Sequence, residues 1–126
     1  GLGDVYKRQV PISNLVEAIN FAEKEIKNFG LRAPMVGHVG DGNFHAILLV
    51  DPENPKEMRA AKTVAKKMAN LAISLGGTCT GEHGIGIGKL GFMPEQLGHA
   101  WKVMGNIKEA LDPSNIMNPG KLIKKN

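Results

Sequence analysis

The stretch Gly37–His45, GHVGDGNFH, places a tight turn directly before a strongly apolar segment. An Asp-Gly pair between apolar residues is typical of a two-residue hairpin loop. The run Phe44–Val50, FHAILLV, is typical of a buried strand. We therefore expect an antiparallel hairpin that turns at Asp41 and Gly42.

This hairpin register brings together two of the four histidines of the chain, His38 and His45. Directly opposed residues have their Cβ atoms about 4.5–5.5 Å apart, so both imidazoles can bind one metal ion. Alternatively, both rings form ordinary hydrogen bonds in a half-buried sheet. A catalytic zinc-type site usually has three protein ligands, and Glu82 in the sequence GEHG can supply the third. His83 beside it is a candidate proton acceptor, because neutral histidine takes up a proton near pH 7.

Three segments show the three- and four-residue apolar spacing of amphipathic helices. The first spans Ile12–Phe29, the second follows Pro55 and ends before the Gly76-Gly77 pair, and the third spans Pro94–Leu111. The buried face of the second is expected to contain Met58, Ala61, Ala65, Met68, Ala72 and Leu75, and that of the third Leu97, Trp101, Met104, Ile107 and Leu111. The glycine-rich sequence TCTGEHGIGIGK between them is expected to be irregular.

Composition excludes several classes of function. The net charge is +4, but the lysines are spread along helices without interleaved aromatic residues, so no nucleic-acid partner is expected. No apolar run is long enough for a transmembrane segment. The single cysteine, Cys79, cannot form a disulfide within the chain and is expected to be buried, whereas His99 is expected to be structural or exposed. Gly86–Gly91 matches G-x-G-x-x-G, but it does not follow a buried apolar strand, so a dinucleotide site is not expected.

The first nine residues, GLGDVYKRQ, do not begin with methionine and show no periodicity that joins them to the helical segment after them. We expect residues 1–9 to be a non-native or truncated leader outside the fold. Residues 10–126 would then form one domain, the tail of a longer protein.

Three motifs in order, GHVGDGNFH, GTCTGEHGIG and LDPSNIMNPGKL, resemble the C-terminal part of FAD-linked oxidases of the D-2-hydroxyacid dehydrogenase group. Within that group the resemblance is closest to cytochrome-type D-lactate dehydrogenases and to the flavoprotein subunit of glycolate oxidases, and it covers about residues 10–123. It implies an α+β fold, namely the C-terminal portion of a ferredoxin-like cap (substrate) domain. It also implies an N-terminal FAD-binding domain, which this chain does not contain.

The resemblance assigns roles to particular residues. It implies that a divalent metal, zinc or manganese, is bound by His38, His45 and Glu82, the set that the spacing also suggested. His83 matches the histidine that abstracts the substrate proton. Asn118, in the sequence NPGK, matches a segment that returns toward the flavin and is expected to contact FAD.

The substrate expectation depends on Ile47. Relatives that act on D-2-hydroxyglutarate have asparagine at this position, and an apolar side chain suits a small substrate such as D-lactate or glycolate better. The resemblance therefore implies an FAD- and metal-dependent dehydrogenase that oxidises a small D-2-hydroxy acid to the 2-oxo acid. Its electrons would pass to a cytochrome, a quinone or an electron-transfer protein, and the fragment alone would be inactive.

Two alternatives remain open from the residues. A metal-dependent hydrolase could use the same His/His/Glu site to activate water, and a non-catalytic cap module could simply bind the metal. A yellow flavin bound to the full-length protein would favour the dehydrogenase over both. The compartment is expected to be cytoplasmic or membrane-peripheral in a bacterium and mitochondrial in a eukaryote.

Overall fold

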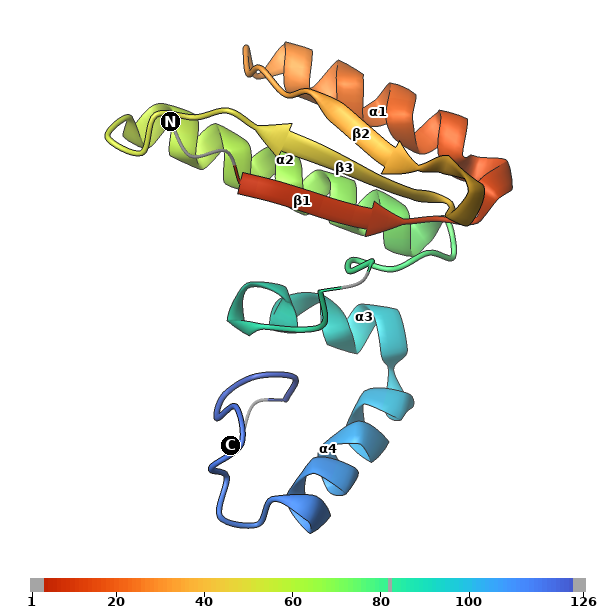
Figure 1. The fold of residues 1–126 in the computed structure, drawn as a ribbon, viewed down its shortest axis with the longest axis vertical. Coiled ribbons are helices and arrows are strands. Elements are labelled where there is room, and N and C mark those ends of the chain that lie inside the picture. Colours follow the sequence, from red (N-terminus) through yellow and green to blue (C-terminus); the bar gives the residue numbers. More distant parts are fainter. Residues whose placement is uncertain (1–3, 82, 124–126) are drawn as a thin grey trace. The chain divides into compact units, whose positions relative to one another are not determined.

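A computed structural model describes residues 4–81 and 83–123 of the chain, which divides into two compact units, Gly1–Gly81 and Glu82–Asn126. The elements of the first unit are β1 (Asp4–Gln9), the 3-10 turn η1 (Ile12–Asn14), α1 (Leu15–Asn28), β2 (Met35–His38), the 3-10 turn η2 (Val39–Asp41), β3 (Asn43–Leu48) and α2 (Pro55–Ser74) (Figure 1). Helices packed on an antiparallel sheet make this an α+β fold, as predicted.

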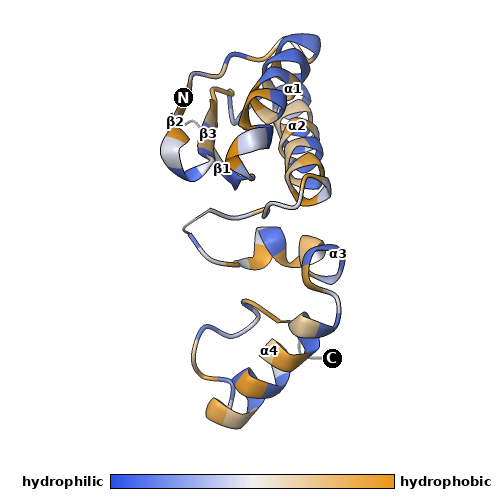
Figure 2. Cartoon of the chain, turned by 90° about the vertical axis from the view of Figure 1, so that its right-hand side faces the viewer, coloured by the Kyte–Doolittle hydropathy of each residue, from blue (hydrophilic) through white to orange (hydrophobic). Residues whose placement is uncertain are grey.

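The sheet of the first unit has the strand order β1-β3-β2, and β3 pairs antiparallel with both neighbours. Figure 2 shows α1 and α2 together on one face of this sheet. Phe44, Ala46 and Leu48 of β3 are at most 3% exposed and belong to the core that these helices cover. Because side chains alternate along a strand, the residues between them lie on the opposite face.

The helix α1 begins later than the apolar spacing predicted. Residues 12–14 form a 3-10 turn instead, in which the Asn14 N–H donates to the Pro11 carbonyl at 2.8 Å. Ile12 is therefore 61% exposed, and Phe29 is 38% exposed after the last helical residue, so neither belongs to the buried stripe. The stripe consists of Leu15, Ala18, Ala22 and Ile26, with Glu25 beside it.

The helix α2 matches its prediction closely. Asn54 caps it by accepting hydrogen bonds from the N–H groups of Lys56 and Glu57, and Pro55 occupies the first turn, where its missing N–H costs nothing. The buried face contains Ala61, Val64, Ala65, Met68, Ala69 and Ala72. An ion pair between Lys67 and Glu25, with Nζ and Oε2 2.6 Å apart, joins α2 to α1.

The leading residues take part in the sheet. Asp4–Gln9 forms β1, which pairs along one edge of β3, with Gln9 opposite Asn43. The expectation that this stretch lies outside the fold is therefore wrong for Asp4–Gln9. A strand edge pairs through backbone groups, which the side-chain pattern of a sequence does not reveal. That residues 1–9 are a non-native or truncated leader stays a prediction.

The second unit contains η3 (Ile87–Phe92), α3 (Met93–Leu97) and α4 (His99–Leu111), followed by a series of turns. The single helix predicted from Pro94 to Leu111 is wrong, because the chain breaks at Gly98, whose φ of 51° and ψ of −125° no helix contains. The glycine-rich segment is also more regular than predicted, since its last residues enter the 3-10 helix Ile87–Phe92.

The apolar face of α4 is only partly covered within its own unit. Trp101 and Met104 are half-buried, as expected. Ile107 and Leu111, which the periodicity placed inward, are 55% and 73% exposed. Among the described residues of this unit, no side chains cover the C-terminal end of α4, so its apolar residues there are more exposed than predicted.

Across the described residues, no helix is both long enough and apolar enough to cross a lipid bilayer.

Candidate functional site

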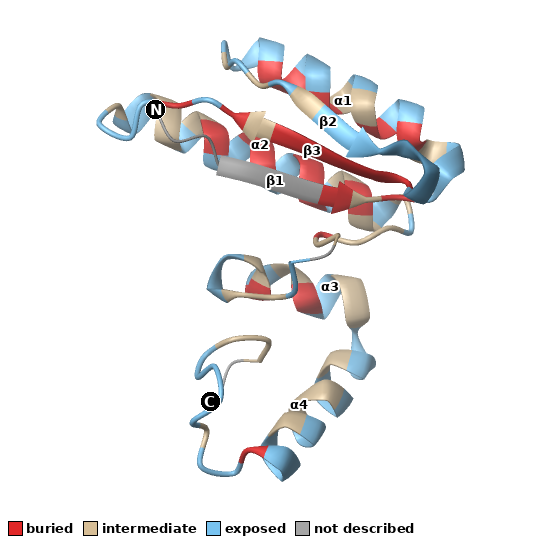
Figure 3. Ribbon diagram, in the orientation of Figure 1, coloured by how far each residue is buried: buried red, intermediate tan, exposed pale blue. Residues whose placement is uncertain are grey.

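The face of the sheet opposite α1 and α2 contains three of the residues that the sequence singled out, His38, His45 and Ile47. Asn43, His45 and Ile47 alternate along β3 with the core residues, so all three lie on this face. In β2, His38 and Val36 pair with Asn43 and His45 and therefore share the same face. Figure 3 shows the contrast in exposure between buried β3 and exposed β2.

The two histidines lie side by side, although in a different register from the one predicted. Their ring centroids are 5.9 Å apart and the rings meet edge-on at 77°. His45 is 5% exposed, whereas His38 is exposed. Imidazoles so placed can approach one metal ion from two sides.

The predicted two-residue hairpin loop is wrong, and with it the direct pairing of His38 with His45. Residues 39–42 make a longer turn in which η2 is closed by Gly42, whose N–H donates to the Val39 carbonyl at 3.3 Å. His38 is therefore opposite Asn43, and His45 is opposite Val36. A register change of two residues keeps every side chain on its face, so the histidines remain diagonal neighbours.

Asn43 was not predicted as a site residue. Its side chain is 6% exposed, and its Oδ1 atom is buried without a hydrogen-bond partner among the described residues. The amide lies against Gly81, where a Cβ atom would be 3.2 Å from both Oδ1 and Nδ2. A buried carbonyl oxygen without a partner lowers the stability of the fold by about 1–3 kcal/mol, so such atoms are rare unless they have a function. Only the correct register reveals that Asn43 lies opposite His38.

The third expected ligand, Glu82, lies outside the described residues. Among the residues that are described, no group of three or more His, Cys, Asp or Glu side chains is arranged to hold a metal ion. His83 is exposed at the start of the second unit, between Glu82 and Gly84. The metal set His38, His45 and Glu82 and the base His83 therefore stay predictions.

The chemistry of the expected ligands is compatible with a divalent ion. Two imidazoles, from His38 and His45, lie on one sheet face, and the expected third ligand, Glu82, would add a carboxylate oxygen. Nitrogen and oxygen donors of this kind suit zinc and manganese. Asn43 Oδ1, which is buried on the same face without a hydrogen-bond partner among the described residues, is a polar atom that a neighbouring donor would satisfy.

Ile47 is half-buried on this face, two residues beyond His45 along β3. Its position beside the histidine pair is compatible with the substrate-contacting role expected from the sequence, which stays a prediction. A surface groove of about 420 Å³ elsewhere in the unit is lined by residues of α1 and β2 and their connection, from Glu23 to Met35, and by none of the expected site residues.

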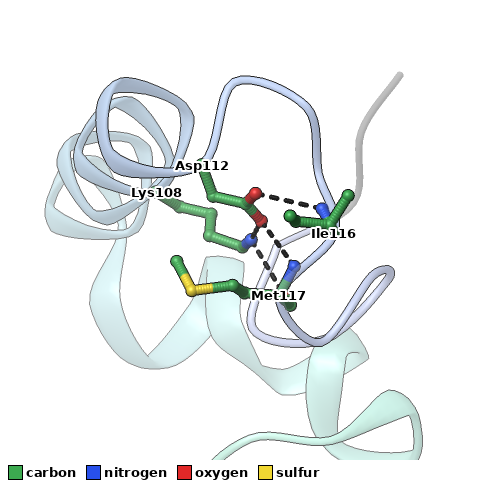
Figure 4. Close-up of polar contacts among 4 residues, drawn as sticks. All are labelled: Lys108, Asp112, Ile116 and Met117. Carbon is green, nitrogen blue, oxygen red and sulfur yellow. Dashed lines mark hydrogen bonds and ion pairs between the residues drawn. The ribbon is translucent and has the colours of Figure 1, made fainter.

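The C-terminal turns, which contain Asn118, are held by one buried carboxylate, Asp112. It accepts hydrogen bonds from the N–H groups of Ile116 and Met117, each at 3.0 Å, and forms an ion pair with Lys108 (Figure 4). Lys108 also donates to the Met117 carbonyl at 2.7 Å. The Lys108 ammonium and the two amides lower the pKa of the Asp112 carboxyl, against the opposing effect of its burial. This network gives the turn a defined shape just before Asn118.

Asn118 is exposed and has a φ of 48°, in the left-handed region. Leu122 has a φ of 65° and is held from both sides: its N–H donates to the Ile85 carbonyl at 3.1 Å, and its carbonyl accepts from Trp101 Nε1 at 2.8 Å. The Asn118 carbonyl accepts from the Lys121 N–H at 3.1 Å, and its exposed side chain is compatible with a polar contact with a flavin. That contact stays a prediction.

Two further expectations are confirmed. Cys79 is completely buried and forms no disulfide. His99 is exposed as the first residue of α4.

Comparison with known proteins gives the family. The C-terminal domain of FAD linked oxidases matches residues 4–122, and the chain belongs to this family. A mitochondrial D-lactate dehydrogenase (cytochrome) of Arabidopsis thaliana is 44% identical over 115 residues, which are 90% of this chain and 20% of the relative. A probable mitochondrial D-lactate dehydrogenase of Danio rerio is 41% identical over 116 residues, 91% of this chain and 23% of the relative.

A relative with lower identity carries a different substrate in its name. The glycolate oxidase subunit GlcD of Bacillus subtilis is 37% identical over 115 residues, 90% of this chain and 24% of the relative. The chain spans about a fifth to a quarter of the length of these relatives. The family and its link to FAD, which the three motifs predicted, are confirmed.

Proposed function

We propose that the chain is the metal- and substrate-binding part of an FAD- and divalent-metal-dependent dehydrogenase, which oxidises a small D-2-hydroxy acid to the 2-oxo acid. The main support is the edge-on pair of His38 and His45 on the face of the sheet opposite α1 and α2, with ring centroids 5.9 Å apart and half-buried Ile47 on the same face. The family, and the D-lactate dehydrogenases and glycolate oxidase subunit among its relatives, support the reaction class.

In this proposal His38, His45 and Glu82 hold the ion. When bound, the ion supplies positive charge for a developing alkoxide and the flavin supplies a hydride acceptor. Imidazole nitrogen suits zinc and carboxylate oxygen suits manganese, so either metal is compatible with the set. His38 and His45 direct their rings from two adjacent strands, which sets the direction of two of the three ligands.

His83 takes the proton from the substrate hydroxyl. It follows Glu82 directly, so a ligand and a base would be presented by consecutive residues between Gly81 and Gly84. Neutral imidazole is suited to accept a proton near pH 7. Asn118, which is exposed in the C-terminal turns, contacts the flavin.

Ile47 sets the substrate size. An apolar side chain two residues from a metal ligand gives no partner to a second carboxylate, which favours D-lactate or glycolate over longer diacids. The remaining partners of the proposal are an N-terminal FAD-binding domain of the same protein and an electron acceptor, either a cytochrome, a quinone or an electron-transfer protein. The compartment would be mitochondrial in a eukaryote and cytoplasmic or membrane-peripheral in a bacterium.

The experiment replaces the neighbours Glu82 and His83 separately in the full-length enzyme and measures metal stoichiometry beside turnover. Glu82→Gln removes a charged oxygen from the ion, so metal content and activity should fall together. His83→Asn removes only the proton acceptor, so metal should stay bound while turnover falls by roughly 10²–10⁴-fold.

The replacement His99→Asn is the control, because His99 is exposed on α4 and has no role in the proposal. Loss of metal from His83→Asn with retention in Glu82→Gln would reverse the two roles. A full-length protein that binds metal, lacks flavin and hydrolyses esters or amides would contradict the dehydrogenase altogether.

A further inference from the structure

The buried amide of Asn43 has an oxygen atom that the rest of the site does not use. The side chain is 6% exposed, and Oδ1 has no hydrogen-bond partner among the described residues. A buried carbonyl oxygen without a partner is unfavourable unless a hydrogen-bond donor reaches it in another state of the protein.

The register of the sheet points to His38. Asn43 is paired directly with His38 across β2 and β3, so their side chains project from the same face. Residues paired in this way have Cβ atoms about 4.5–5.5 Å apart, within reach of an imidazole and an amide. His45 is two residues along the same strand and therefore farther from Asn43.

His38 is also the ligand that most needs orientation. It is exposed at the end of β2, and its ring contacts His45 edge-on without a hydrogen bond to the described residues. His45, by contrast, is 5% exposed, so packing restricts its ring. An exposed imidazole can rotate between several rotamers and exchange its ring proton between both nitrogens.

We propose that Asn43 is a positioning residue of the metal site, whose Oδ1 accepts a hydrogen bond from the ring N–H of His38 when an ion is bound. This bond fixes the tautomer, leaves the other ring nitrogen free for the ion, and supplies the donor that the buried oxygen lacks. Metal-ligating histidines almost always donate their second nitrogen to an acceptor of this kind. The inference rests on the proposed metal site.

The packing around the amide supports a fixed acceptor. Gly81 packs tightly against the Asn43 amide, because a Cβ at Gly81 would be 3.2 Å from Oδ1 and from Nδ2, closer than ordinary contact. The amide is therefore held between β2 and the residue that precedes Glu82. An acceptor fixed in this way can orient a mobile ring at little entropic cost.

The test measures Zn²⁺ affinity of the full-length enzyme by competition with a chromogenic chelator. The variants are Asn43→Ala, Asn43→Leu, which keeps the volume without an acceptor, and Asn43→Asp, which keeps the acceptor. Val36→Ala is the matched control, because Val36 is exposed on the same face and pairs with His45. We expect the Ala and Leu variants to bind Zn²⁺ about 10–100-fold more weakly. The Asp variant and the control should stay within a few-fold of the original.

If Asn43 had a purely structural role, Asn43→Asp should weaken Zn²⁺ binding more than Asn43→Leu does, because a buried carboxylate without a donor is less favourable than an apolar side chain. An Asp variant that binds as weakly as Asn43→Ala would therefore overturn the inference. So would Ala and Leu variants with unchanged affinity, while the proposed metal site would stand. An original enzyme that binds no Zn²⁺ would overturn the metal site and the inference together.

Discussion

At the scale of single residues, the proposal assigns the choice of substrate to Ile47. It is half-buried on the sheet face opposite α1 and α2, two residues from His45. We expect Ile47→Asn in the full-length enzyme to shift preference from D-lactate toward D-2-hydroxyglutarate by roughly 1–3 kcal/mol, because the amide offers a hydrogen bond to a distal carboxylate. The ratio of kcat/KM for the two substrates measures the shift.

Ile47→Val is the control for this prediction, since it keeps the site apolar and removes only one methylene group. Its ratio should stay close to that of the original enzyme. If the original already prefers D-2-hydroxyglutarate, the argument from this position is wrong.

The turn between β2 and β3 offers a matched pair of glycines. Gly42 has a φ of 68°, and a Cβ there would be 2.0 Å from the Val10 carbonyl oxygen, whereas Gly40 has no atom within 4 Å of such a Cβ. Gly42→Ala should lower the free energy of unfolding by at least 1–3 kcal/mol, roughly the cost of strained backbone alone. Gly40→Ala should change it by less than about 0.5 kcal/mol. Denaturant unfolding of both variants checks this, and equal losses would contradict the turn geometry.

The residues of the site were partly predictable. Alternation along β3 was enough to place His45 and Ile47 on one face, and His38 followed because a two-residue register change preserves faces. Asn43 was missed because the predicted register placed it opposite Gly40 rather than His38. The 3-10 turn responsible depends on Gly42 fitting against Val10, a contact between distant parts of the chain that no local pattern encodes.

At the scale of elements, the C-terminal turn depends on the charge of Asp112. The Lys108 ammonium and two backbone N–H groups lower its pKa from the usual 3.8, so the folded turn binds fewer protons than the unfolded chain. The Asp112 carboxylate therefore stabilises the turn fully when the pH is above the usual pKa of the unfolded chain. This stabilisation is lost as the pH falls through the lowered pKa of the folded turn. We expect the amides of Ile116 and Met117 to lose protection from hydrogen exchange in that acidic range.

Asp112→Asn provides the control for the acid transition. The amide still accepts hydrogen bonds but does not titrate, so exchange at Ile116 should be faster at neutral pH and should show no such acid step. A step that persists in this variant would assign the transition to another group.

Helices with a strong apolar stripe were the most predictable elements. α2 buries the predicted face, because the apolar residues at helical spacing are the ones that pack against the sheet. The third predicted helix instead divides at Gly98, and Ile107 and Leu111 remain exposed within the second unit. Periodicity shows that a face is apolar, but it does not show whether this chain covers it.

At the scale of the whole molecule, the chain corresponds to about a fifth to a quarter of its relatives' length. The family was predictable because three short motifs occur in the right order, which is a far more specific signal than composition. The division into units 1–81 and 82–126 was not predicted, although its boundary lies within the glycine-rich sequence that was expected to be irregular. The expectation that the chain alone does not oxidise hydroxy acids remains, because hydride transfer needs a bound flavin beside the substrate.

The most direct measurement is flavin reduction in the full-length enzyme under anaerobic conditions. We predict that D-lactate or glycolate bleaches the flavin absorbance and that L-lactate does not. Prior removal of the divalent ion by a chelator, or the replacement His45→Ala, should slow the bleaching by at least about 10–100-fold, and returning the ion should restore the rate only in the original enzyme. Bleaching at an unchanged rate after metal removal and in His45→Ala, or a full-length protein without flavin, would contradict the account.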